Sequence, residues 1–271
     1  MPEGDTIARA AARLRPLLVG EPLLEVRHRG AALRDLVGAR VETIDVHGKH
    51  LWLRLDGGHA IHVHLGMEGR WTLISADGLA RSPHRVASAA LALVVRLGGA
   101  LCLDAPTVEV ITGVDARDPA RRLGLGPDVM ARDLDLDDIL ARAVAGPNRR
   151  RPLGELLLDQ RVAAGIGNVW KSELCFLERM DPRSPAEAFA PDALIALYRR
   201  AARMMVHGMS AIRRITTTEV GVGPVDGPYW VYRRADRPCA RCRTPIVRIL
   251  QGAEVPRSTY LCPACQAPPA R

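Results

Sequence analysis

Four cysteines near the C-terminus constrain the fold more tightly than any other feature of the sequence. Cys239-Ala-Arg-Cys242 and Cys262-Pro-Ala-Cys265 form two C-x2-C pairs separated by 19 residues. This spacing is typical of four thiolates that hold one Zn²⁺ ion in a tetrahedron. The alternatives are two disulfides, or cysteines without a partner, and a reducing compartment disfavours disulfides. We expect one structural zinc ion, because protein ligands fill all four positions.

The segment between the two cysteine pairs predicts a β-hairpin. IVRIL and STYL alternate like its two arms, and Arg257 lies between them at the expected tip. An arginine on a rigid hairpin could present its forked guanidinium to phosphate. The alternative is one solvated arginine among many. Cys102 and Cys175 lie in apolar segments and are expected to be small buried residues.

The charge balance favours a polyanionic partner. Lys plus Arg number 38 against 30 Asp plus Glu, a net charge of +8, and such an excess favours binding to phosphates. Codon bias offers another explanation for the arginine excess as a whole. Lys49 and Lys171 are the only lysines, so chemistry that needs an amine has few groups to choose from.

The sequence gives no reason to expect a membrane partner. The first residues do not form a signal peptide, and charged residues interrupt the apolar runs. A cytoplasmic protein with reduced cysteines is therefore expected.

Periodicity predicts a strand-rich first half and a helical second half. Residues 6–19 place Ile7, Ala10, Ala11, Leu14 and Leu18 on one helical face. From about 23 to 112, short β-branched segments separated by Gly and Asp-Gly turns predict a sandwich or barrel. They are LLEVRH, RVETIDVH, HLWLRLD, HAIHVHL, RWTLIS, ASAALALVVRL and ALCLD.

The second half is expected to begin after a linker at 116–131, which is rich in Pro, Gly and Arg. Helices are expected over 133–145, 151–162, 168–180 and 191–209. Residues 215–228 lack periodicity and predict a mobile loop.

Two short stretches are ambiguous when each is considered alone. Pro2 and Thr6 suit an ordinary helix start, with Thr6 as the cap. Ala164-Gly165-Ile166-Gly167-Asn168 joins two helices, and Asn168 is expected to cap the second. The N–H groups at that helix start could bind a DNA phosphate, although a plain helical hairpin would look similar.

Taken together, five ordered elements resemble the Fpg/Nei family of formamidopyrimidine-DNA glycosylases and endonuclease VIII enzymes. They are Pro2-Glu3-Gly4, Gly48-Lys49-His50, His64-Leu65-Gly66-Met67-Glu68-Gly69, Ala164-Gly165-Ile166-Gly167-Asn168 and the cysteine hairpin with Arg257. The resemblance extends over essentially the whole chain.

The resemblance implies an α+β fold with two domains. An N-terminal β-sandwich with flanking helices would span 1–115, a linker 116–131, and a helical helix–two-turn–helix (H2TH) domain 132–230. The zinc finger would span 231–271. A monomer that associates with the nucleoid in the cytoplasm is expected.

The resemblance also implies a bifunctional DNA glycosylase and abasic-site (AP) lyase of base excision repair. In this family Met is removed and the nitrogen of Pro2 attacks the sugar, while Glu3 is the general acid. Lys49 and Arg257 would hold phosphates at the catalytic centre, and Asn168 would hold a neighbouring one. Met67 would fill the gap left by the flipped base. For Met67 the alternative is a buried residue on a β-hairpin. Lys171 is expected to support DNA binding or to be exposed.

The expected DNA partner is a duplex with oxidised bases or abasic sites. PEGDT resembles the endonuclease VIII branch, which favours oxidised pyrimidines. LCLDAPTVEV lacks the Arg-Phe-Gly strand of the purine branch, and 216–228 lacks its Gly-Gly-Thr-Thr pattern. Thr6 occupies a position where both branches commonly have Glu, which suggests stronger activity on abasic DNA. The alternatives are a preference for oxidised purines, action on abasic sites only, or a non-catalytic zinc-dependent protein that binds damaged DNA.

Overall fold

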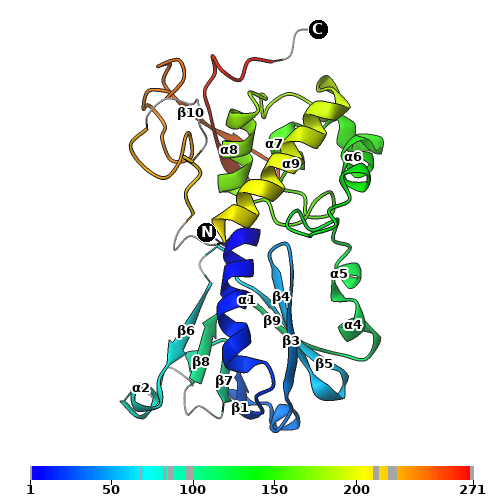
Figure 1. Cartoon of the computed structure of the whole chain (residues 1–271), viewed down its shortest axis with the longest axis vertical. Helices are drawn as coiled ribbons and strands as arrows, with labels where there is room; N and C mark the ends of the chain where they lie inside the picture. Colours follow the sequence, from blue (N-terminus) through cyan, green and yellow to red (C-terminus); the bar gives the residue numbers. More distant parts are fainter. Residues whose placement is uncertain are drawn as a thin grey trace. The chain divides into compact units, whose positions relative to one another are not determined.

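The computed structural model divides the chain into two compact units, Met1–Gly124 and Leu125–Arg271 (Figure 1). We refer to them as the N-terminal and C-terminal units. The structure describes residues 2–67, 69–81, 84, 88–95, 100–209, 214–218 and 225–268. Among these residues, no helix has both the length and the apolar character needed to cross a bilayer.

The N-terminal unit contains two antiparallel sheets. The five-stranded sheet has the order β2-β1-β7-β8-β6, and the four-stranded sheet has the order β3-β4-β5-β9. The strands of the first sheet are β1 (Leu23–His28), β2 (Ala31–Ala32), β6 (Arg70–Ile74), β7 (Leu91–Val95) and β8 (Ala100–Asp104). Those of the second are β3 (Val41–His47), β4 (His50–Leu55), β5 (His59–His64) and β9 (Thr107–Thr112). Apolar residues from both sheets form one buried cluster, which confirms the predicted sandwich.

The predicted strands are present over their described residues, and β2 and β9 are additional ones. The sequence of β9, TVEVIT, lies within the strand-rich region but was not among the predicted segments. Short helices α2 (Ala76–Arg81), α4 (Val114–Arg117) and α5 (Pro119–Arg122) also belong to this unit. Residues 82, 83, 85–87 and 96–99, part of the expected ASAALALVVRL strand among them, lie outside the described residues.

Helix α1 (Gly4–Leu18) begins two residues earlier than Thr6, so Thr6 is not its cap. Glu3 is the N-cap residue with extended backbone, and its carbonyl accepts from Thr6 N–H at 2.8 Å. The Asp5 carboxylate also accepts from Thr6 N–H, at 2.8 Å. An acidic side chain in the first turn stabilises the unpaired N–H groups there. The predicted apolar face is buried, apart from half-buried Ala10.

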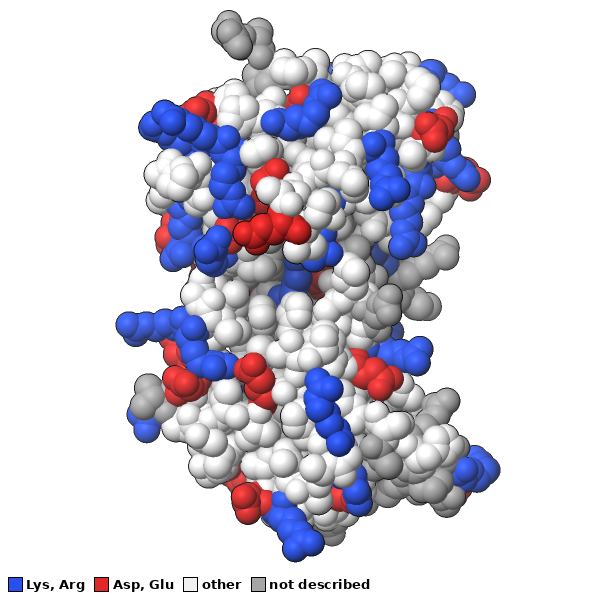
Figure 2. All heavy atoms as spheres, turned by 180° about the vertical axis from the view of Figure 1, so that it is seen from behind, with Lys and Arg blue, Asp and Glu red and all other residues white. Residues whose placement is uncertain are grey.

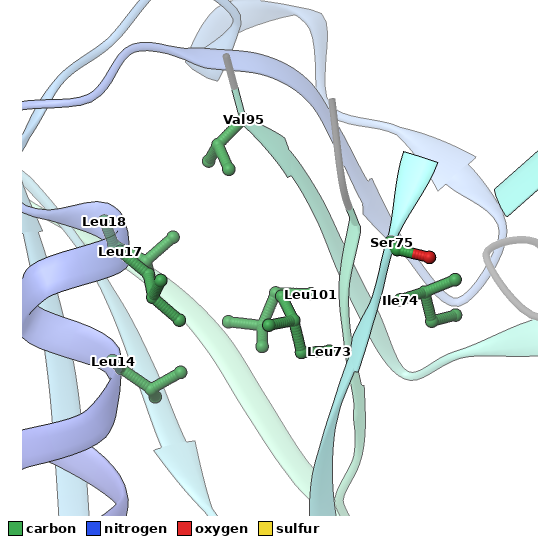
Figure 3. A pocket seen from close by; sticks show the side chains of 8 residues that line it. All are labelled: Leu14, Leu17, Leu18, Leu73, Ile74, Ser75, Val95 and Leu101. Carbon is green, nitrogen blue, oxygen red and sulfur yellow. The ribbon is translucent and has the colours of Figure 1, made fainter. Parts of the chain in front are cut away.

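Helix α1 packs on the sandwich through its apolar face and leaves a small apolar cavity (Figure 3). The cavity has a volume of about 130 Å³. Leucines from α1 face β6, β7 and β8 across it, and Ser75 is the polar residue among those that line it. An apolar space of this kind has no groups to recognise a nucleotide, so we attribute it to packing.

The C-terminal unit is built around a second core of helices. They are α6 (Leu136–Val144), α7 (Leu153–Leu156), α8 (Asn168–Leu177) and α9 (Pro191–Gly208). Trp170, Phe176 and Tyr198 are among its largest buried side chains. The predicted helices near 133, 168 and 191 are confirmed with small shifts in their ends.

The predicted helix over 151–162 is wrong, since only the single turn α7 forms there. Asp159 accepts hydrogen bonds from Arg151 and from the side chain and backbone N–H of Arg161. The N–H of Gly126 bonds to the Gln160 carbonyl at 2.9 Å. These contacts compete with helical hydrogen bonds and hold the segment in turns.

The chain ends in the predicted hairpin, with arms β10 (Val247–Gln251) and β11 (Arg257–Leu261). Arg257 is the first residue of β11 and pairs with Gln251, next to the tip. Residues 219–224 of the expected loop over 215–228 lie outside the described residues.

Candidate active site and zinc centre

The N-terminal Pro-Glu pair is held at the head of α1. The Glu3 carbonyl accepts from the N–H groups of Thr6 and Ile7 at 2.8 and 3.1 Å. The Glu3 side chain is buried, whereas Pro2 is half-buried. Removal of Met1 would leave the Pro2 nitrogen as a secondary amine one residue before a fixed carboxyl group.

The head of α1 lies at the same end of the N-terminal unit as the turn that carries Lys49. Val19, just after α1, pairs with Val41 at the start of β3, and Arg15 donates to the Ile44 carbonyl at 2.8 and 3.1 Å. From the Val19–Val41 pair, the chain of α1 runs back about 22 Å to Gly4. The chain of β3 runs forward about 20 Å from the same pair to His47, in the same direction. Figure 1 shows the N-terminus and the β3–β4 turn at one end of the unit.

The Lys49 turn is a tight two-residue connection. His47 and His50 pair across the hairpin, with Gly48 and Lys49 between them. Gly48 has a φ of 58°, which glycine adopts without the steric cost of a side chain. This glycine explains why Lys49 stands at the point where the chain reverses.

The segment that carries Met67 leaves the sheet at the same end. His64, the last residue of β5, pairs with His50, so Gly66 and Met67 follow directly. Met67 is 55% exposed, and the alternative of a buried methionine is therefore wrong. Its wedge role stays a prediction, and Glu68 lies outside the described residues.

The close approach of backbone atoms around Gly69 explains why this motif ends in glycine. A Cβ atom there would lie 2.2 Å from the Leu65 carbonyl oxygen and 2.8 Å from that of Asp104. No side chain fits this approach, because both neighbours are backbone atoms. The strand pairings and the contacts of α1 place Pro2, Glu3, Lys49 and Met67 at the same end of the N-terminal unit.

Asn168 starts α8, but it does not cap the helix as predicted. Gly167 is the N-cap residue with extended backbone, and no side chain caps this end. Asn168 is the first helical residue and is 7% exposed. Its Oδ1 atom is buried without a hydrogen-bond partner in the described part of the chain. A buried acceptor without a donor is costly. A ligand could supply that donor, or the side-chain amide could be turned so that its NH₂ group faces a phosphate.

Lys171 is buried, which contradicts the expectation that it could be simply exposed. Its Nζ atom donates to the Ser258 carbonyl at 3.2 Å. One residue later, the Ser172 hydroxyl accepts from the Tyr260 N–H at 3.2 Å. The start of α8 thus packs beside the start of β11, and Asn168 and Arg257 lie toward the same end of the C-terminal unit.

Glu173 is a buried acid that the sequence analysis missed. Its carboxylate accepts from the N–H groups of Trp230, Val231 and Tyr232 at 2.8–2.9 Å, and it contacts the Thr216 hydroxyl. Burial raises the pKa of Glu173, whereas these donors oppose the shift. The available signal was an acidic residue directly before the apolar run Leu174–Leu177, in a helix whose residues are all buried.

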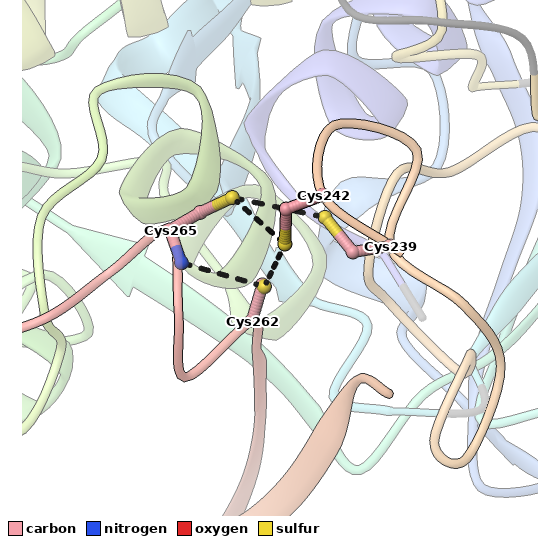
Figure 4. A group of neighbouring side chains, drawn as sticks. All are labelled: Cys239, Cys242, Cys262 and Cys265. Carbon is pink, nitrogen blue, oxygen red and sulfur yellow. Dashed lines mark hydrogen bonds between the residues drawn. The ribbon is translucent and has the colours of Figure 1, made fainter. Parts of the chain in front are cut away.

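The four predicted zinc ligands come together in one cluster (Figure 4). Their sulfur atoms all lie within 4.8 Å of one another. Cys242 Sγ lies 3.4 Å from both Cys262 Sγ and Cys265 Sγ, and Cys239 Sγ lies 3.9 Å from Cys265 Sγ. Tetrahedral Zn–S bonds of about 2.3 Å place sulfurs about 3.8 Å apart. The cysteines are not disulfide-bonded, so the cluster fits a four-thiolate metal site. Cys102 and Cys175 are buried elsewhere, as predicted.

Basic side chains stand on the surface of both units (Figure 2). On the face drawn there they are interspersed with Asp and Glu. On this face, basic side chains are therefore present on both units and are not gathered on one of them.

Comparison with known proteins identifies the family. Residues 1–107 match the formamidopyrimidine-DNA glycosylase N-terminal domain, and residues 125–220 match the formamidopyrimidine-DNA glycosylase H2TH domain. A probable endonuclease 8 2 from Streptomyces coelicolor is 38% identical over 274 residues, covering 100% of this chain and 95% of that protein. A protein named DNA-(apurinic or apyrimidinic site) lyase Nei2, from Mycolicibacterium smegmatis, is 37% identical over 98% of this chain and 99% of its own length.

A solved structure confirms the same architecture. The crystal structure of the MutM (Fpg) protein from Thermus thermophilus is 30% identical, with a TM-score of 0.76, and 98% of each chain is covered. The match includes the sandwich, the H2TH helices and the cysteine hairpin. The chain therefore belongs to the Fpg/Nei family of DNA glycosylases.

Proposed function

We propose that this chain is a bifunctional DNA glycosylase and AP lyase that uses the Pro2 nitrogen as its nucleophile. The observation that supports this most directly is the position of Pro2 and Glu3, at the end of the N-terminal unit where the Lys49 turn also lies. Relatives named endonuclease 8 and AP lyase match nearly the whole chain, which supports the same conclusion.

The chemistry follows from the properties of an N-terminal proline. An α-amino group has a pKa of about 7.7–8.0, well below that of lysine at about 10.4. A useful fraction is therefore neutral and nucleophilic near pH 7. Attack of the nitrogen on C1′ displaces the damaged base and gives an iminium ion, because a secondary amine keeps its positive charge when it forms a double bond to carbon. The iminium acidifies the C2′ proton and drives β,δ-elimination of the phosphates.

The remaining residues assist this reaction or hold the DNA. Glu3 protonates the sugar oxygen that leaves C1′ as the ring opens, and then transfers protons during elimination. Lys49 and Arg257 hold phosphates around the damaged nucleotide, and Asn168 holds a neighbouring one. Met67 fills the space left in the base stack, which costs a few kcal/mol to open.

Zinc has a structural role in this proposal. Cys239, Cys242, Cys262 and Cys265 would hold one Zn²⁺ ion, and the ion would fix the hairpin that presents Arg257. Thiolates would fill all four ligand positions and would leave no open position for water or substrate.

The substrate class that we propose is duplex DNA with oxidised pyrimidines or abasic sites. Thr6 lies in the first turns of α1, where its hydroxyl contacts the Asp5 carboxylate at 3.3 Å. It cannot supply the carboxylate that the family commonly has there. We therefore expect faster turnover of an abasic duplex than of a thymine glycol duplex. The name of the 37% identical relative, an AP lyase, agrees with this preference. Equal or faster turnover of thymine glycol would contradict it.

The test of the function is borohydride trapping. When protein with Met1 removed is mixed with abasic duplex and reductant, a covalent adduct should form. Pro2→Gly should slow its formation strongly, because glycine replaces the secondary amine by a primary one. Glu3→Gln keeps the shape of the side chain but removes its ionisable proton, so this variant tests the role of Glu3 as general acid. The competing function is a zinc-dependent protein that only binds damaged DNA. Tight binding without any adduct would favour that protein over an enzyme.

A further inference from the structure

Three histidines, a tryptophan and a glutamate lie together on the face of the four-stranded sheet that points away from the sandwich core. Along β4 and β5, alternate residues such as Leu51, Leu53 and Ile61 are buried in the sandwich core. The residues between them point to the opposite face because strand side chains alternate. That face carries His50, Trp52, His62 and His64, and Glu109 lies next to His62 on β9.

These side chains form a continuous chain of contacts from α5 to the Lys49 turn. Arg122 Nη2 on α5 lies 2.7 Å from Glu109 Oε2. The same oxygen lies 3.5 Å from His62 Nδ1, and His62 Nε2 lies 2.9 Å from His50 Nδ1. His50 directly follows Lys49 in the sequence. We call Arg122, Glu109, His62 and His50 the histidine chain.

The two histidine rings lie edge to edge and nearly coplanar, and Trp52 packs nearly parallel to both of them. The His50 and His62 rings lie 5.2 Å apart with an interplanar angle of 19°. The Trp52 ring stacks on His62, with centroids 5.2 Å apart and an angle of 16°. His62 is 2% exposed. The short nitrogen–nitrogen contact therefore joins two rings that have little freedom to turn.

Proton counting assigns the tautomer of both histidines. Burial opposes ionisation of Glu109, but hydrogen bonds from Arg122 and His62 keep its pKa below the usual value. As a carboxylate it only accepts, so His62 Nδ1 carries the proton. Burial lowers the pKa of His62, so this ring is neutral and its Nε2 accepts. His50 Nδ1 must then donate.

The charges around His50 favour the same arrangement. The pKa of His50 is lowered to about 3, most of all by burial and then by the charges of His64, His62, His47 and Lys49. The sheet face also holds an ion pair between Asp45 and Arg54. A protonated His50 would bring a second positive charge next to the Lys49 ammonium group, which costs energy in a partly buried site. The neutral ring avoids this and leaves Nε2 without a proton.

We propose that the histidine chain is a positioning network for Lys49. It holds His50 as a neutral Nδ1–H ring and so fixes the turn from which Lys49 reaches its phosphate. This role rests on the proposed function of Lys49, whereas the protonation pattern does not. Arg122 lies just before the end of the N-terminal unit at Gly124, so the network links the last helix of this unit to the Lys49 turn.

The first test needs no DNA. Two-bond ¹H–¹⁵N NMR spectra of the full zinc-loaded protein, labelled in histidine, report which ring nitrogen is protonated. We expect Nδ1–H for both His50 and His62 at pH 7, whereas a free neutral imidazole favours Nε2–H. We also expect His50 not to titrate between pH 5 and 8. Nε2–H at His50, or titration of His50 near 6.5, would overturn the proposal.

The second test compares three variants on abasic duplex. Glu109→Ala should lower the single-turnover trapping rate at saturating DNA by about tenfold or more, because a misplaced group costs up to about a hundredfold. Glu109→Gln should retain most of the rate, since its amide oxygen still accepts from His62. Glu25→Ala is the matched control, because it removes an acid paired with Arg27 on the other sheet.

The outcomes separate this proposal from the proposed function. If wild-type protein traps DNA but Glu109→Ala is as fast as Glu25→Ala, the positioning role fails and the enzyme stands. If wild-type protein gives no adduct, the function fails and the NMR result still decides the tautomers. A lower rate that Glu109→Gln does not rescue would mean that the acid acts other than by accepting from His62, which also overturns the proposal.

Discussion

Replacing Glu173 by alanine should loosen the segment that leads into the zinc module. The Glu173 carboxylate accepts from the three successive N–H groups of Trp230, Val231 and Tyr232 at 2.8–2.9 Å, and all four residues are buried. Alanine would leave three buried donors without an acceptor. Each orphaned donor costs about 1–3 kcal/mol. We therefore expect the three donors together to lower the free energy of unfolding by about 3 kcal/mol or more.

Hydrogen exchange measures this loss where it occurs. Each 1.4 kcal/mol is a tenfold change in the opening equilibrium, so amide exchange at 230–232 should accelerate by roughly a hundredfold or more. Glu178→Ala is the control, because Glu178 pairs with Arg200 at a partly exposed position and its loss should cost about 1 kcal/mol or less. Equal exchange at 230–232 in the two variants would refute the reasoning.

Four further predictions concern processing, metal, charge and pH. Protein with Met1 retained should be inactive, since the Pro2 nitrogen is then an amide; intact-mass spectrometry paired with a nicking assay checks this. Chelating the zinc should abolish DNA binding together with the native CD spectrum of the hairpin, and added Zn²⁺ should restore both. Lys49→Ala should weaken abasic-DNA binding and reduce the salt dependence of log Kd by about one phosphate contact, measured by titration at several salt concentrations. The pKa of His50 is about 3 in the folded protein against about 6.5 in an unfolded chain. The unfolded state takes up the proton first, so this group should cost roughly 1–2 kcal/mol of stability as pH falls from about 6.5 to about 5, checked by urea unfolding at each pH.

The regular elements of this protein could be predicted from the sequence because their signals are local. The apolar stripe of α1, the alternation of β4 and the spacing of the cysteines each depend on nearby residues. The prediction failed over 151–162, where Asp159 bonds to neighbouring arginines in place of a helix. Competition of this kind depends on side-chain geometry that periodicity does not report.

The candidate site was predictable only where a motif marked it. Pro2 and Lys49 belong to ordered motifs, so the resemblance indicated them, whereas the cysteines were predicted from their spacing. The burial of Lys171 was not predicted, and Glu173 was not singled out. Their partners on β11 and near Trp230 are distant in the sequence, so no local pattern indicates them. The contact between His50 and His62 depends on strand register, which pairs residues that are distant in the sequence.

The most direct test of the central claim is to locate the covalent bond. After borohydride trapping on abasic DNA, proteolysis and tandem mass spectrometry should find the reduced sugar on the nitrogen of Pro2. Lys49 is the other amine in the described part of the N-terminal unit. An adduct on Lys49, or on Lys171, would contradict the account.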